Sequence, residues 1–325
     1  MNDNNTKPLV VFTASSLALP LLNQLQKNGQ LTTVVLPALE SSSPFAHEVF
    51  NLRARLQEKG IPYLNCGKEQ LSELVHDLDR MQVEVGVIFT YPHVLPEKLL
   101  AYFAHGVFNL HGSRLPAYPG PCPLYWQIRN REPVLTLTLH KATNEPDQGD
   151  IVATREIPIH PLDTLQSLSN QMAWLALPLI AELQQVLAGQ KLTYQPQLTA
   201  DKNWESMPGK NYARRPRASD LQIIWHNMSA EAISAMCRAG AGQPFSALFY
   251  YNNCPLLLQQ ATPVDYPQFG ITAGTILFIG EPEGLIVATR ENAVRLDIIS
   301  CADGLFTGYA FAERFSLDAG IQLKS

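Results

Sequence analysis

Residues 83–110 read VEVGVIFTYPHVLPEKLLAYFAHGVFNL and contain a strand, a helix and a second strand in close succession. Val83 to Phe89 and Val107 to Leu110 are short apolar runs of the kind found in buried strands. Between them, Pro96 to Phe103 has the spacing of a short helix. Two strands joined through a helix predict a parallel pair within an α/β sheet.

The same alternation extends in both directions from this segment. Further strands are predicted at residues 9–12, 32–36, 61–64, 134–140 and 151–157. Helices are predicted at residues 17–26, 44–59, 71–81 and 162–187. Strands that alternate with helices indicate an open, Rossmann-like parallel sheet with helices on both faces. We assign residues 1–205 to this domain.

The sequence changes character near residue 190. Residues 206–217 are polar and rich in proline and arginine, so we interpret them as a linker. Beyond it, residues 229–238 predict a helix with Ser229 as its N-cap. Short strands separated by turn signals follow at 248–251, 274–279, 284–289 and 293–299. Residues 218–325 are therefore predicted to form a small, OB-like β-barrel domain.

The bulk properties exclude several classes of protein. Hydrophobic residues make up 46% of the 325 residues and charged residues 16%, a balance that is typical of globular proteins and excludes a disordered chain. The net charge of −5 provides no general attraction to nucleic acid or to an anionic membrane. A polar first segment and the lack of long apolar runs predict a cytoplasmic protein without membrane contact. The sequence leaves the oligomeric state open.

Two common kinds of site are not expected. The five cysteines are scattered, odd in number and never spaced as C-x-x-C, which argues against a disulfide framework and against a zinc site. The segment that follows the first strand, Thr13 to Leu17, contains neither the G-x-G-x-x-G motif of dinucleotide-binding proteins nor a P-loop. The glycines that allow a pyrophosphate to approach the backbone are therefore missing, which disfavours a dinucleotide enzyme.

Polar residues occur where the strand at residues 107–110 ends. Asn109 and His111 are two positions apart, so the alternation of a strand places both side chains on one face. The carboxyl end of a strand in an α/β sheet is also where ligands bind. An isolated N-x-H tripeptide is common by chance, and a second cluster strengthens the interpretation. The loop between the strands at 134–140 and 151–157 carries Asp147, Gly149 and Asp150.

Together, these clusters resemble the folate-dependent formyltransferases. The family pattern N-[IL]-H-x-S-x-L-P-x-x-x-G corresponds to NLHGSRLPAYPG at residues 109–120. The pattern H-x-[MV]-x-x-x-x-D-x-G-x-I is similar to HKATNEPDQGDI at residues 140–151. VIFTYPHVLP at 87–96 and NYARRPRASDLQIIW at 211–225 extend the resemblance over most of the chain.

The resemblance implies that Asn109, His111 and Asp147 are the catalytic set. Attack of an amine on a formyl carbon generates a tetrahedral oxyanion, which an Asn109 N–H and a protonated His111 can stabilise. Asp147 can hold His111 in its useful tautomer and accept the proton that the amine loses. The implied co-substrate is 10-formyltetrahydrofolate, and no metal is required. Its expected contacts are Phe89, Tyr91, His93, Val94, Leu95, Ser113, Leu115, Pro116 and Asp150.

The acceptor of the formyl group is less clear. Family members that act on initiator tRNA carry a basic insertion after the second strand, where this chain reads PALESSSP at residues 37–44. Phosphate contacts need cations, so tRNA is possible but disfavoured. Arg214, Arg215 and Arg217 form the only basic run, which we interpret as a solvated linker. A small amine, such as an amino sugar or an amino-acid derivative, is the favoured acceptor. Methionyl-tRNA, hydrolysis of 10-formyltetrahydrofolate and a non-catalytic folate-binding module are the alternatives.

Overall fold

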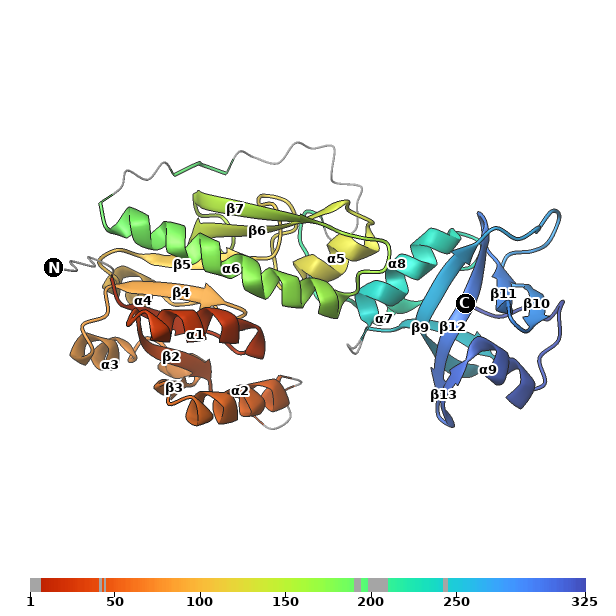
Figure 1. Ribbon diagram of the computed structural model, residues 1–325, viewed down its shortest axis with the longest axis horizontal. Coiled ribbons are helices and arrows are strands. Elements are labelled where there is room, and N and C mark those ends of the chain that lie inside the picture. The colour runs from red at the N-terminus through yellow and green to blue at the C-terminus, as the bar shows by residue number, and fades with distance from the viewer. Residues whose placement is uncertain (1–6, 41–42, 44, 190–193, 198–209, 242–244) are drawn as a thin grey trace.

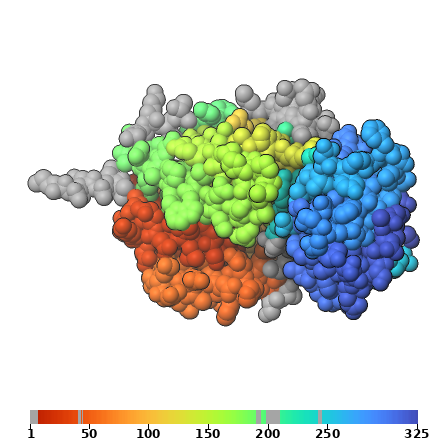
Figure 2. Space-filling view, turned by 45° about the vertical axis from the view of Figure 1, so that its right-hand side comes forward, coloured from red at the N-terminus to blue at the C-terminus, as the bar shows by residue number. Residues whose placement is uncertain are grey.

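The chain forms two lobes in this computed structural model, each with its own sheet (Figure 1). The structure describes residues 7–325 except 41–42, 44, 190–193, 198–209 and 242–244. In the space-filling view, the residues beyond the linker form a separate lobe beside the first (Figure 2). The two domains expected from the sequence are therefore present as two separate sheets.

The first domain contains a seven-stranded sheet in the order β3-β2-β1-β4-β5-β6-β7. Strands β1 to β5 are all parallel, as expected for an α/β sheet. The last two strands are antiparallel, so the Rossmann-like sheet is mixed at this edge. The loop of residues 142–150 joins β6 to β7 without a crossover helix, and a short loop can connect only antiparallel neighbours. The strands are β1 (Leu9–Phe12), β2 (Leu31–Pro37), β3 (Tyr63–Cys66), β4 (Val85–Phe89), β5 (Val107–His111), β6 (Val134–Lys141) and β7 (Ile151–Pro158).

Helices cover both faces of this sheet. They are α1 (Leu19–Lys27), α2 (Ala46–Glu58), α3 (Val75–Arg80), α4 (Glu97–Tyr102), α5 (Pro123–Arg129) and α6 (Leu165–Leu187), with short 3-10 turns at Ser16–Ala18 and Lys68–Gln70. Strand β1 shows how the faces are separated. Leu9 and Val11 pack into the core beneath α1 and α6, whereas Val10 and Phe12 pack into the core beneath α3 and α4. Both faces of a central parallel strand are buried, so its sequence is apolar throughout.

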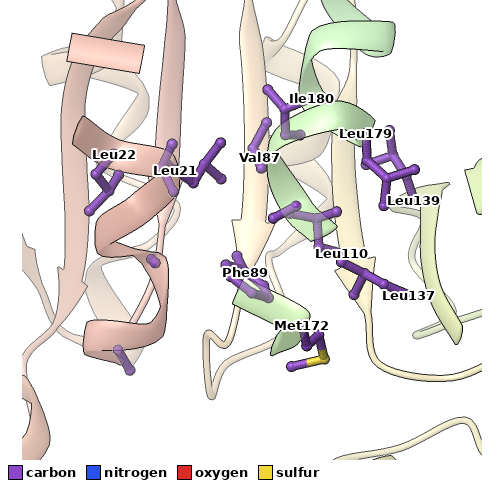
Figure 3. Close-up of a cluster of buried hydrophobic side chains, with 14 of the residues drawn as sticks. Leu21, Leu22, Val87, Phe89, Leu110, Leu137, Leu139, Met172, Leu179 and Ile180 are labelled. Atoms are coloured by element: carbon purple, nitrogen blue, oxygen red, sulfur yellow. The ribbon is translucent and has the colours of Figure 1, made fainter. Parts of the chain in front are cut away.

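The larger core joins α1 and α6 to the sheet. Figure 3 shows Leu21 and Leu22 of α1, Val87 and Phe89 of β4, and Leu179 and Ile180 of α6 within it. In this view Met172 of α6 lies at the lower edge of the cluster. A Cβ atom at Gly112 would come within 2.9 Å of the Met172 sulfur. A glycine therefore allows the chain that follows His111 to lie against α6.

The second domain is a small closed β-structure, which confirms the expected β-barrel. Its strands are ordered β10-β11-β12-β9-β8, and β13 pairs with β12. The last residues of the chain bridge the two open edges, because Lys324 pairs with Tyr250 of β8 and Gln322 pairs with Thr275 beside β10. The elements are α7 (Ala218–Leu221), α8 (Ala230–Gly240), β8 (Ala247–Tyr251), β9 (Cys254–Val264), β10 (Ile276–Gly280), β11 (Gly284–Ala288), β12 (Ala293–Cys301), β13 (Gly304–Thr307) and α9 (Gly308–Arg314).

The linker returns the chain to the first domain before the second begins. Residues 210–217 are the described part of this connection, and residues 206–209 lie outside the described residues. The amide of Cys122 donates to the carbonyl of Ala213 at 2.8 Å, and the amide of Tyr118 donates to the carbonyl of Lys210 at 2.7 Å. The linker therefore lies against the loop between β5 and α5.

No helix in the described part of the chain is long and apolar enough to span a membrane.

Candidate active site

The site is built where β5 and β6 pair antiparallel at the edge of the parallel strands. Asn109 and His111 lie at the end of β5, and Asn109 lies opposite His140 of β6. His111 is buried, with 6% of its surface exposed, and His140 is buried at 1%. Both Asn109 and His111 direct a nitrogen toward the same oxygen of Asp147, each at 3.3 Å. The structure thus brings the three predicted residues together.

The Asp147 carboxylate receives contacts on both of its oxygens. Oδ1 accepts from the Asn109 amide and faces His111 Nδ1, and Oδ2 accepts from the backbone N–H of Gly120 at 2.8 Å. Asp147 itself has a φ of +60°, a left-handed conformation that few residues other than glycine adopt. Thr90 and Tyr118, in the loops after β4 and β5, also have positive φ values of 58° and 56°. Backbone strain of this kind concentrates at functional sites.

His111 has a hydrogen-bond acceptor beside each ring nitrogen. Nδ1 faces the Asp147 carboxylate at 3.3 Å, and Nε2 lies 2.9 Å from the carbonyl oxygen of Tyr118. A neutral imidazole carries one N–H and satisfies only one of these acceptors. A doubly protonated ring carries an N–H toward each of the two acceptors.

His140 is the group that sequence analysis did not single out. Burial lowers its pKa to about 4, with a further lowering from nearby His111, so the ring is neutral at physiological pH. Its Nδ1 lies 3.0 Å from the Lys141 carbonyl and must carry the single proton to donate there. Its Nε2 is then an acceptor for the Asn109 amide, 3.0 Å away. His140 therefore fixes the orientation of the Asn109 side chain, with both amide N–H groups directed at His140 and Asp147.

The loop that carries Asp147 is held from outside by the chain that follows α6. Gln197 Nε2 donates to the carbonyls of Asp147 and Gly149, at 2.9 and 2.8 Å. Gln195 forms a two-bond antiparallel bridge with Ile151, at the start of β7. A Cβ atom at Gly149 would lie 1.8 Å from the Lys141 carbonyl oxygen, so only glycine permits this approach. The position of Asp147 thus depends on residues 50 positions further along the chain.

Comparison with known families decides the identity of this arrangement. The family profile described as formyl transferase matches residues 9–181, and the profile described as the C-terminal domain of formyl transferase matches residues 217–307. The first match alone covers more than half of the chain. The chain belongs to the formyl transferase family. The predicted family and the predicted formyltransferase activity are confirmed.

Individual formyl transferases are similar to this chain over most of its length. A methionyl-tRNA formyltransferase from Nitrosomonas europaea is 25% identical over 300 residues, which cover 91% of this chain and 89% of that protein. The sugar 3N-formyl transferase WlaRD, crystallised with dTDP and 5-N-formyl-THF, gives a TM-score of 0.61 at 16% identity and covers 89% of this chain and 96% of its own. At this identity the structural likeness concerns the fold alone.

A longer protein shares the same fold. HypX from Aquifex aeolicus, in complex with tetrahydrofolic acid, gives a TM-score of 0.59 at 15% identity and covers 98% of this chain. The present formyl transferase spans 50% of the HypX chain, about half its length.

The residues expected to contact folate after β4 of this formyl transferase differ in their burial and packing. Phe89 and Leu95 are buried in the cores on either side of the sheet, so any ligand contact from them would involve backbone atoms. Tyr91 packs edge-on against Phe12 and His93, and its hydroxyl is buried without a hydrogen-bond partner among the described residues. Val94 is 58% exposed. The folate contacts of this segment stay predictions.

The expected contacts after β5 and near Asp147 have other partners. The Ser113 hydroxyl is buried and donates to the Ala117 carbonyl at 2.6 Å, which shapes the loop. Leu115 is buried, and the peptide bond between Leu115 and Pro116 is cis. Asp150 is exposed, and its backbone carbonyl accepts from the Lys141 amide. A folate contact from Ser113, Leu115, Pro116 or Asp150 is likewise a prediction.

The neutral His140 makes the stability of this domain depend on pH. Its pKa in the folded protein, about 4, lies below the ordinary value of 6.5, so the unfolded chain binds this proton more strongly between the two values. We expect the free energy of unfolding to fall as the pH drops from about 6.5 toward 4, by on the order of 3 kcal/mol from this residue. Urea unfolding at pH 7 and at pH 4.5 measures the effect.

The control for this measurement is His140→Gln. Its side-chain oxygen can still accept from Asn109, but the residue does not titrate. The difference in unfolding free energy between pH 7 and pH 4.5 should be smaller in this variant than in the wild type. An unchanged pH dependence would contradict the assignment of a buried neutral histidine at this position.

Proposed function

We propose that this protein transfers the formyl group of 10-formyltetrahydrofolate to the amino group of a small primary amine. The observation that carries the proposal is the partly buried contact of Asn109, His111 and Asp147 at the end of β5, in a member of the formyl transferase family. Tetrahydrofolic acid bound to HypX and 5-N-formyl-THF present with WlaRD support a folate as the formyl donor.

The reaction needs stabilisation of one charge and transfer of one proton. The amine nitrogen forms a bond to the formyl carbon, and the formyl oxygen becomes an oxyanion. The bond from carbon to N10 of the folate then breaks, N10 gains a proton, and the amine loses one. Hydrogen-bond donors placed at the oxyanion contribute most to the rate of such a step, and a positioned base contributes a further part.

The geometry suggests how the three residues share these tasks. The Asn109 N–H that faces Asp147 makes the longer of its two contacts, 3.3 Å against 3.0 Å to His140, so it is the weaker bond and the N–H that an oxyanion can share. His111 in its doubly protonated form adds a positive charge beside it. Asp147 stabilises that charge and accepts the proton of the amine, directly or through water. His140 keeps the Asn109 amide in its orientation.

The distribution of charge supports a small acceptor over tRNA. Residues 218–325 contain ten acidic and five basic residues, a net charge of −5 that equals the charge of the entire chain. Residues 1–217 are balanced, with nineteen of each. Binding of tRNA requires cations that neutralise several phosphates. The second domain, which is acidic, provides no excess of positive charge for that contact.

Several cations near the site are also paired with acids. Arg114, which follows the catalytic strand, forms an ion pair with Glu156. Arg214 of the linker pairs with Asp220 at 2.6 Å, and Lys210 pairs with Glu132 at 3.1 Å. A phosphate backbone would have to compete with these carboxylates. A small amine requires only a few positioned polar groups beside the catalytic residues.

Methionyl-tRNA is the second candidate acceptor. The similarity to the Nitrosomonas europaea methionyl-tRNA formyltransferase includes both domains and covers 91% of this chain, which favours it. The charge distribution opposes it.

A panel of acceptors tests the proposal. Purified protein would be supplied with 10-formyltetrahydrofolate and, separately, with amino sugars, nucleotide-linked amino sugars, amino acids and charged initiator tRNA. We expect turnover with a small amine and weak or absent formylation of the tRNA. Efficient formylation of the tRNA that falls steeply between about 50 and 200 mM salt would contradict the proposal, because such dependence reports phosphate contacts.

A further inference from the structure

The linker lies against the residue that binds the Asp147 carboxylate. The backbone N–H that binds the Asp147 carboxylate belongs to Gly120, which has a φ of +109°. A Cβ atom at this glycine would lie 2.9 Å from a ring carbon of Tyr212. The ring of Tyr212 therefore lies against the residue that holds the catalytic carboxylate, and 60% of the Tyr212 surface is exposed.

Three residues after Tyr212, an arginine of the linker stacks on an aromatic ring from a distant part of the chain. The Arg215 guanidinium lies 5.1 Å from the ring centroid of Phe45, immediately before α2. Both side chains are exposed. Burial raises the pKa of the Cys122 thiol, and the positive charge of Arg215 opposes that shift. The amide of Cys122 also donates to the carbonyl of Ala213, two residues before Arg215, so this part of the linker lies beside the loop that contains Gly120 and Cys122.

Arg215 differs from its neighbour in its partners. Arg214 is held by both oxygens of Asp220, stacks on Trp126 and accepts a hydrogen bond from the indole of that residue through its carbonyl. These contacts give Arg214 a structural role in the linker. Arg215, in contrast, forms no ion pair with any acid in the described part of the chain. A guanidinium that is positioned by an aromatic ring and lacks a carboxylate partner is suited to bind an anion.

We propose that Tyr212, Arg215 and Phe45 form a subsite for an anionic group, a phosphate or a carboxylate, carried by the amine acceptor. The inference rests on the proposed function and specifies its substrate class. Arg215 binds the anion by charge-assisted hydrogen bonds, Phe45 fixes the guanidinium plane, and the Tyr212 ring borders the path toward Asp147. An amino sugar linked to a nucleoside diphosphate and an amino acid both carry such a group. This role replaces the interpretation of Arg215 as a solvated linker residue.

Direct binding tests the subsite without turnover. Isothermal titration of the full chain would use inorganic pyrophosphate for the phosphate source and glutamate for the carboxylate source. We expect one of these probes to bind the wild type, and Arg215→Ala to weaken that binding by about tenfold or more, as expected for a lost charge-assisted contact. Arg217→Ala, which removes another exposed linker arginine, should change the Kd by less than about twofold. Binding of neither probe, or equal binding to the wild type and Arg215→Ala, would overturn the proposal.

Kinetics separate this inference from the proposed function. In Arg215→Ala and Phe45→Leu, we expect a higher KM for an anionic amine, whereas the KM for the folate and the rate with a matched uncharged amine should be unchanged. Turnover of anionic amines with no dependence on Arg215 would remove the subsite and leave the function. Binding of an anionic probe that depends on Arg215, with no amine formylated, would support the subsite and remove the function.

Discussion

Asp147→Asn should lower kcat for formyl transfer by about a thousandfold, within the range that general acid–base groups contribute. In the wild type, one carboxylate oxygen faces both Asn109 and His111 at 3.3 Å. An amide of the same size can no longer balance a positive charge on His111 or accept the proton of the amine. Because the substitution preserves shape, steady-state kinetics with the panel of amines can measure the loss in a folded protein.

The control is an acid from the same loop that faces solvent. Glu145 is exposed and lies two residues before Asp147, so Glu145→Gln should retain the wild-type rate within about twofold. The dissociation constant for the folate should also be nearly unchanged in Asp147→Asn. A kcat for Asp147→Asn within about tenfold of the wild-type value would show that the carboxylate does not take part in the chemical step.

His111→Ala should lower kcat by about a hundredfold or more, which is the effect of removing one donor to an oxyanion. The ring is buried and lies between the Asp147 carboxylate and the Tyr118 carbonyl. Its removal eliminates the imidazole donor beside the proposed oxyanion, whereas Asp147 keeps its bonds from Asn109 and Gly120 and the Tyr118 carbonyl keeps its bond from Ser113. Single-turnover kinetics with bound folate isolate this effect from substrate binding.

A histidine outside the site provides the comparison for this variant. His105 lies before β5, where it contacts Glu84 at 3.3 Å. His105→Ala should therefore leave the single-turnover rate within about twofold of the wild type. A loss in His111→Ala that appears only in the folate Kd, with the rate at saturation preserved, would instead assign His111 to folate binding.

The sequence was sufficient for the parts of the fold that local patterns determine. Strands β1 to β5 are short apolar runs, and each was predicted within two residues at either end. Helix α5 was missed. Residues 112–123 contain four prolines and were interpreted as a loop, and the helix begins at the last of these prolines, Pro123. Strand β9 was also missed. It combines leucines with two adjacent glutamines, and its alternation of buried and exposed residues is recognisable only beside β12.

The site was predictable to the extent that its residues lie in two local motifs. Asn109 and His111 share a strand face, and Asp147 follows at a spacing that the family resemblance supplied. The role of His140 depends on the antiparallel register that places it opposite Asn109, and that register is a tertiary property. Two other contacts are also tertiary. Gln197 donates to the carbonyl of Asp147, 50 residues earlier in the chain, and the Arg215 guanidinium lies over the ring of Phe45. No local pattern contains these pairs.

The measurement that tests the central claim most directly follows the formyl carbon itself. Wild-type protein would be given 10-formyltetrahydrofolate labelled in the formyl group, with and without the amine that gives the fastest turnover in the acceptor panel. We predict that the label appears in the N-formyl product in a one-to-one ratio with tetrahydrofolate, and that little formate is released. Asp147→Asn should abolish most of this product. Release of the label as formate at the same rate with and without the amine would show a hydrolase, and no release of tetrahydrofolate under any condition would show a folate-binding module. Either result would contradict the proposed formyl transfer.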